Sequence, residues 1–176
     1  MKRKSPVFQS VRSLTVAAML TALSVVIGIF CKNFLNFGGG LFRITFENFP
    51  IILSGFCFGP IVGGMVGIAT DLISYLLSNQ VYPPNLIVTA GAFLIGFFSG
   101  LLFRVPLKHR TLRIVFSASL AHLIGSVIVK SIGLYQFYGI AVLWRIPTYF
   151  VIASVEILLI CLLFRRKSFS NLIDKI

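Results

Sequence analysis

The sequence predicts an all-α integral membrane protein with six transmembrane helices in a single domain, residues 1–176. Of the 176 residues 57% are hydrophobic and only 11% are charged, whereas soluble domains carry roughly 25% charged residues. A soluble chain of this length could not bury so much apolar surface in one core. The apolar residues also come in blocks, several of which reach the roughly 17–25 residues that cross a bilayer.

Six apolar blocks give the expected spans, which are 13–31, 47–58, 60–78, 86–103, 112–132 and 144–164. The second block is short, and Gly59-Pro60 separates it from the third. The basic start MKRK and the first block together resemble a signal peptide, but further spans follow, so we interpret this block as the first span. Three longer connections are rich in glycine, asparagine and aromatic residues: CKNFLNFGGGLFRITFEN, SNQVYPPN and GLYQFYGIAV.

The net charge of +12 is spread between the apolar blocks and forms no patch, which argues against a nucleic-acid partner. If the N-terminus is cytoplasmic, twelve of the sixteen cations lie inside. The four outer ones are Lys32, Arg43, Lys130 and Arg145. The positive-inside rule therefore predicts cytoplasmic termini and places the three long connections outside, where they cap a ligand cavity.

Residues 58–72, FGPIVGGMVGIATDL, combine small residues with one acid. Gly64, Gly67 and Asp71 share one helical face, and small residues let two helices pack closely in lipid. Close packing alone accounts for the glycines. A charge within a span costs at least about 2.5–3.5 kcal/mol, so we expect Asp71 to face the bundle interior and to have a partner there.

Other polar residues within the spans suggest an outward-facing cavity. His122 and Glu156 are expected at a similar depth near the midplane, as a polar clamp between helices or as part of a ligand site. Lys130 and Arg145 are expected near the outer rim, where they either snorkel to the interface or hold a ligand. The predicted ligand has an aromatic body, hydrogen-bond donors for a carboxylate, and anionic groups.

Aromatic residues gather in or beside the outer connections, either as an interfacial belt or as a lid. They are Phe34, Phe37, Phe42, Tyr82, Tyr135, Phe137, Tyr138 and Trp144. Gly38, Gly39 and Gly40 would let the first connection move. We therefore expect segments 34–42 and 135–138 to close over the ligand.

Several signals point away from enzymes and metal sites. The chain has no Walker A, HExxH or GxSxG motif, which excludes ATP hydrolysis by this chain. Its three cysteines, Cys31, Cys57 and Cys161, have no metal-ligand spacing and are expected to be free thiols. No cofactor and no metal are expected. Ala18 and Ala22 form a small-residue patch on the first span, for helix packing or for docking another membrane subunit.

The segment RITFENFPIILSGFCFGPIVGGMVGIATDLISYLL resembles the second and third spans of the substrate-binding (S) components of energy-coupling factor (ECF) transporters. It is most similar to the folate-specific family. WRIPTYFVIASVEILLICLLF, with an Arg near its start and a Glu eleven residues later, resembles that family's last helix. The Ala18–Ala22 patch is similar to the AxxxA motif with which S components meet their shared transmembrane subunit.

The resemblance implies a bacterial plasma-membrane subunit that captures folate outside. It would work with one coupling membrane subunit and two ATPase subunits, which supply the energy for release inside. The residues expected to bind the ligand are Asp71, Arg43, Arg145, Lys130, Tyr82, Asn85, Phe34, Trp144, His122 and Glu156, and those expected to dock the partner are Ala18 and Ala22. Two alternatives stay open: an S component for another vitamin such as pantothenate, and a small membrane-embedded enzyme that uses His122, Glu156 and Asp71.

Overall fold

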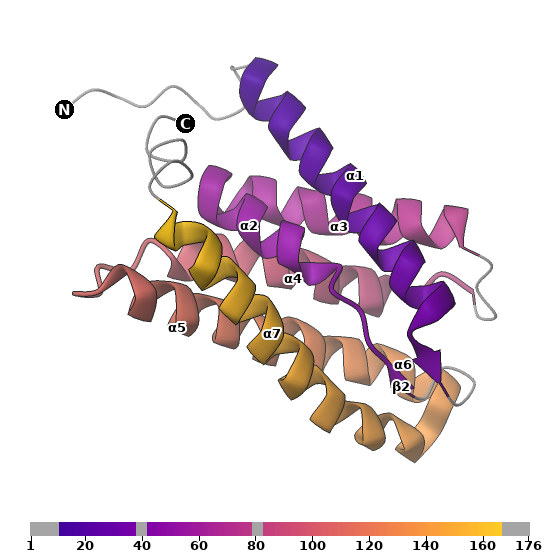
Figure 1. Cartoon of the computed structure of the whole chain (residues 1–176). Coiled ribbons are helices and arrows are strands. Elements are labelled where there is room, and N and C mark those ends of the chain that lie inside the picture. Colours follow the sequence, from indigo (N-terminus) through magenta and orange to yellow (C-terminus); the bar gives the residue numbers. More distant parts are fainter. Residues whose placement is uncertain (1–10, 38–41, 79–82, 167–176) are drawn as a thin grey trace.

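The computed structural model describes residues 11–37, 42–78 and 83–166, without the side chains at 12, 36, 37, 42 and 43. This part of the chain is a bundle of helices with one short hairpin, in which each strand has two residues (Figure 1). The helices are α1 (Val11–Phe34), α2 (Asn48–Phe58), α3 (Pro60–Leu77), α4 (Leu86–Leu102), α5 (Arg110–His122), α6 (Ser131–Tyr138) and α7 (Arg145–Arg165). A π-helix, η3 (Leu123–Lys130), joins α5 to α6, and a 3₁₀ helix, η4 (Gly139–Trp144), joins α6 to α7. The hairpin pairs β1 (Asn36–Phe37) with β2 (Phe42–Arg43) in antiparallel register.

Judged by length and composition, three stretches of this bundle could cross a membrane. They are Ser13–Phe34, Pro60–Leu77 and the helical stretch Arg110–Arg165. The helices Asn48–Phe58 and Leu86–Leu102 are apolar but shorter. The start of α1 and the end of α7 lie at the same end of the bundle (Figure 1). This arrangement agrees with termini on one side of the membrane, while six spans and a cytoplasmic position of the termini stay predictions.

The connection GLYQFYGIAV was expected as an outer loop, and this expectation is wrong. Residues 131–138 are the helix α6, and residues 139–144 are the helix η4. The break between them lies at Gly139, whose φ of 54° is open to glycine and disfavoured for other residues. Tyr135 and Phe137 are therefore residues of a helix and not of a mobile loop.

The glycines of α3 bring this helix against α4. A Cβ atom at Gly63 would lie 2.5 Å from the carbonyl oxygen of Gly96, and one at Gly67 would lie 2.2 Å from the carbonyl oxygen of Ala92. Both distances are shorter than any van der Waals contact, so a side chain at either position would force the helices apart. Close packing through small residues, expected from the sequence, is confirmed.

A tight turn separates α2 from α3. Gly59 has a φ of 95° and donates its backbone N–H to the carbonyl oxygen of Gly55 at 2.9 Å, which ends α2. Pro60 then starts α3, where its missing N–H costs no hydrogen bond.

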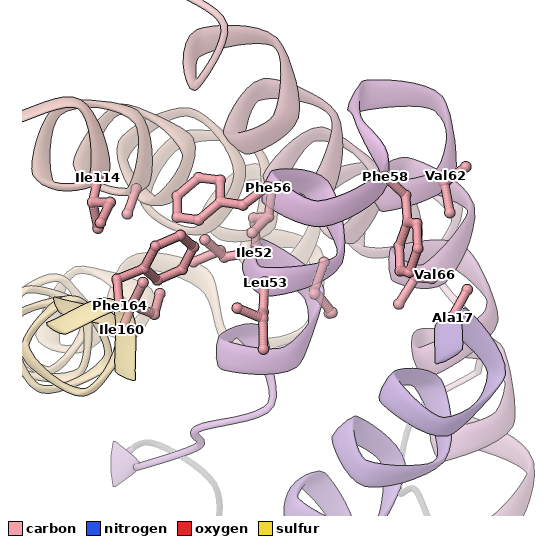
Figure 2. Close-up of a cluster of buried hydrophobic side chains, with 13 residues drawn as sticks. Ala17, Ile52, Leu53, Phe56, Phe58, Val62, Val66, Ile114, Ile160 and Phe164 are labelled. Carbon is pink, nitrogen blue, oxygen red and sulfur yellow. The ribbon is translucent and has the colours of Figure 1, made fainter. Parts of the chain in front are cut away.

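The apolar core is formed by side chains of α1, α2, α3, α4, α5 and α7, and Figure 2 shows its side chains. Phe56 of α2 stacks on Phe103 with ring centroids 4.4 Å apart, and its edge meets Phe164 of α7 at 6.0 Å. These residues come from the end of α2 and the end of α7, so the core occupies the half of the bundle at which α2 ends. The buried cations Lys130 and Arg145 lie toward the opposite half, where α7 begins.

Candidate functional site

A cavity opens in the half of the bundle where α7 begins. Segments that contribute to its wall include the start of α2, the second half of α3, the start of α4, η3 and the start of α7. Its ionisable lining residues other than tyrosine are Lys32, Glu47, Asp71, His122, Lys130 and Arg145. Three of the four acidic residues of the chain, Glu47, Asp71 and Glu156, lie in or directly behind this wall. Because acids are so rare in this sequence, their concentration here marks the cavity as the candidate binding site.

Asp71 reaches the cavity from α3 and has a partner on α4. Its Oδ2 accepts a hydrogen bond of 2.6 Å from the hydroxyl of Thr89. Asp71 is half-buried, so its carboxylate keeps acceptor capacity for a ligand. The expected position of Asp71, inward-facing and partnered, is confirmed.

Asn85 lines the cavity and also fixes the start of α4. Its Oδ1 caps the helix by accepting the N–H of Ile87 at 2.9 Å. Its Nδ2 donates to the carbonyl oxygen of Gly133 at 2.7 Å, which ties α4 to α6. Both the oxygen and the nitrogen of the Asn85 side chain therefore form hydrogen bonds within the protein.

His122 and Glu156 form the pair that their similar depth predicted. His122 Nε2 lies 2.7 Å from Glu156 Oε2, and both side chains are buried. Glu156 Oε1 accepts the backbone N–H of Phe49 at 3.1 Å. Ser126 Oγ lies 3.4 Å from His122 Nδ1. Glu156 thus joins α5 and α7 to the first turn of α2, and His122, unlike Glu156, lines the cavity.

Lys130 and Arg145 line the cavity but are not at an exposed rim, and in this respect the expectation is wrong. Their exposed fractions are 7% and 6%. Lys130 donates to Asn48 Oδ1 at 3.3 Å, and the Arg145 guanidinium carbon lies 4.7 Å from the centre of the Tyr138 ring. The helix does not end near residue 132 as expected; it continues as α6, and Tyr138 of α6 packs on Arg145. Both cations are therefore more buried than a position at an exposed rim predicts.

The lining does not include all of the residues that were expected to contact the ligand. Phe34 and Trp144 are each 67% exposed and do not line the cavity. Tyr82 lies outside the described residues. Arg43 belongs to β2, but its side chain also lies outside them.

The sequence reasoning missed two cavity aromatics, Tyr75 and Tyr149. Tyr75 lies four residues after Asp71, and Tyr149 lies four residues after Arg145. Residues four apart share a helix face, so this spacing could have identified both tyrosines. Glu47 was missed as well, although it is one of only four acids in the chain.

Ala18 and Ala22 lie on an exposed face of α1. Ala17 and Thr21, one residue before each, are buried against the bundle. Within residues 11–37, 42–78 and 83–166 the alanine patch is therefore not used for packing, and it can face lipid or another subunit.

Residues 12–164 match the family described as ECF transporter, substrate-specific component. The match covers most of the chain. This protein is an S component of an ECF transporter. It is therefore a membrane transport subunit, and the alternative of a membrane-embedded enzyme is set aside.

Individual relatives agree with this assignment. The S component is 30% identical over 80 residues to the folate transporter FolT of Clostridium novyi (strain NT), and the alignment spans 44% of this chain and 46% of the relative. A crystal structure of FolT bound with folic acid superimposes with a TM-score of 0.65 at 22% identity, covering 85% of this chain and 90% of that one. The S component of a bacterial ECF transporter superimposes with a TM-score of 0.63 at 24% identity, covering 88% and 94%. These structures confirm the all-helical membrane fold.

Proposed function

We propose that this S component captures folate in the polar cavity and delivers it across the membrane. A curated relative over part of the chain is a folate transporter, and a protein of the same fold binds folic acid. The proposal includes a location in the bacterial plasma membrane, with the cavity open to the outside and the chain acting as one domain.

The distribution of charge in the cavity carries the proposal. Folate has a flat pterin with amino and N–H donors, a benzoyl group, and a glutamate with two carboxylates. Asp71 can accept hydrogen bonds from the pterin edge, and a low-dielectric cavity strengthens such bonds. Lys130 and Arg145 can pair with the glutamate carboxylates. Tyr75 and Tyr149 supply aromatic rings in the same cavity, against which a flat ligand can pack.

Pantothenate matches this cavity less well. It carries one carboxylate and hydroxyl groups, which Lys130 and Arg145 could hold. It has no aromatic ring for Tyr75 or Tyr149, and no amino-pyrimidinone edge for Asp71. Folate uses the acid, the aromatic rings and the cations together.

Transport requires partners, because the chain has no ATP-binding motif. We propose that the Ala18–Ala22 face docks the coupling membrane subunit, which in turn works with two ATPase subunits. Its exposure on α1 supports this use, since small residues let a partner helix approach closely.

The test is to purify the full chain in detergent from folate-supplied cells and to identify co-purified small molecules by mass spectrometry. Folate at close to one molecule per chain is the expected result. Pantothenate, or another vitamin in its place, would overturn the folate assignment while leaving the family assignment intact.

A further inference from the structure

Glu47 was not among the residues expected to bind the ligand, yet it lines the cavity and its carboxylate faces the ammonium group of Lys130. Its Oε1 lies 3.5 Å from the ammonium nitrogen of Lys130. Lys130 also donates to Asn48 Oδ1 at 3.3 Å. Charge-assisted hydrogen bonds usually measure about 2.7–2.9 Å, so the ammonium lies between two acceptors without a tight bond to either.

The rest of the protein holds Glu47 in this place. The hydroxyl of Ser24 on α1 donates to the backbone carbonyl of Glu47 at 2.5 Å. On the same helix, a Cβ atom at Gly28 would lie 2.8 Å from Glu47 Oε2, so the carboxylate lies close against the glycine and would have to shift if a side chain were added there. The helix α2 begins at the next residue, Asn48, which fixes the backbone on the other side. The backbone of Glu47 is therefore held between α1 and α2, and its carboxylate lies beside Gly28 of α1.

The pair is largely shielded from solvent, with side chain exposures of 9% for Lys130 and 13% for Glu47. An unpaired ammonium in such surroundings is costly, and a nearby anion offsets part of that cost. A ligand carboxylate that enters the cavity would supply the same negative charge. It would compete with Glu47 for Lys130, and the two carboxylates would repel each other.

We propose that Glu47 is the internal counter-anion of Lys130 in the empty site, and that a carboxylate of the ligand takes over this role on binding. Glu47 is then a specificity-determining residue. Its charge lowers the affinity for every anionic ligand. Only a ligand whose carboxylate reaches Lys130 regains binding free energy by pairing with that ammonium group. This inference rests on the proposed function, because the ligand it considers is folate.

The test is titration of the purified full chain with folate and with 6-hydroxymethylpterin, which has the pterin ring but no carboxylate. Glu47→Gln keeps the shape and removes the charge. It should lower the Kd for folate about tenfold, which corresponds to one modest charge interaction. The Kd for hydroxymethylpterin should stay unchanged. Asn48→Ala is the matched control, since it removes the other acceptor of Lys130 without changing the charge, and it should not tighten folate.

A second measurement needs no ligand. In the empty protein, Glu47→Gln should lower the Tm more than the double variant Glu47→Gln/Lys130→Met, because the double variant removes the uncompensated cation as well. Equal Tm values would overturn the pairing. Weaker or unchanged folate binding by Glu47→Gln would overturn the exchange. Failure of the unmodified chain to bind folate would instead overturn the proposed function, so the two failures are distinguishable.

Discussion

Asp71 is the residue on which ring recognition depends in this account. Its carboxylate lines the cavity and accepts one hydrogen bond, from Thr89. Asp71→Asn replaces one acceptor by a donor that would face the donors of the pterin. We expect a loss of at least about 1–3 kcal/mol of binding free energy, for both folate and hydroxymethylpterin, measured by titration.

Thr89→Val is the control for this change. It removes the hydrogen bond to Asp71 but keeps the carboxylate, so its effect on both ligands should be smaller. Unchanged binding of hydroxymethylpterin by Asp71→Asn would show that the ring lies elsewhere.

Arg145 should act on the other end of the ligand. Arg145→Ala is expected to weaken folate and to spare hydroxymethylpterin, which has no carboxylate. Because Arg145 is only 6% exposed, salt should screen its charge poorly, and the loss should persist at high ionic strength. Titration of both ligands at low and high salt measures this. If the loss of folate affinity disappeared at high salt, the glutamate carboxylates of folate would lie in solvent and not beside a buried Arg145.

At the scale of the elements, Glu156 holds three helices together. It contacts His122 of α5 and accepts the N–H of Phe49 in the first turn of α2. Glu156→Leu leaves both groups buried without this acceptor, and we expect it to lower the free energy of unfolding by about 1–3 kcal/mol for each group. Glu156→Gln keeps one acceptor oxygen and should cost less. The Tm in detergent measures both.

Ser154→Ala is the matched control for the Glu156 variants. Ser154 is on the same helix but is exposed, and its hydroxyl bonds only to the helix backbone at Phe150. A Tm loss for Ser154→Ala as large as that for Glu156→Leu would contradict a special role of Glu156.

The sequence was sufficient for the features that depend on local pattern. The apolar blocks predict the positions of α1, α3, α4 and α7 to within a few residues. Gly64 and Gly67, which share a helical face, predict a close helix contact, because spacing alone decides which residues share a face. The pairing of His122 with Glu156 follows from depth, since both lie well inside their spans.

The sequence was insufficient where the outcome depends on tertiary contacts. The π-helix Leu123–Lys130 has no sequence signature, and with α6 it carries Lys130 into the interior. Glu47 lies in a connection whose glycines and aromatics suggested a lid, and its partner Lys130 is 83 positions away in the chain. No local pattern links two such residues.

At the scale of the whole molecule, the proposed docking face predicts a separation of binding from transport. Ala18→Trp or Ala22→Trp puts a bulky side chain on the exposed face of α1 and should hold a partner helix away. We expect loss of folate uptake in cells that also contain the coupling subunit and the ATPases, with unchanged folate binding by the isolated chain.

Met19→Trp is the control for the docking face. Met19 is also exposed on α1, at 66%, but it already has a large side chain, and uptake should be retained. Normal uptake by the Ala18 and Ala22 variants would mean that this face meets lipid only.

The central claim is that the cavity of this S component selects folate, and competition binding tests it most directly. The purified chain, freed of ligand, is titrated with folate in the absence and in the presence of excess pantothenate. The account predicts saturable binding of about one folate per chain that pantothenate does not displace. Displacement of folate by pantothenate, or no folate binding at all, would contradict it.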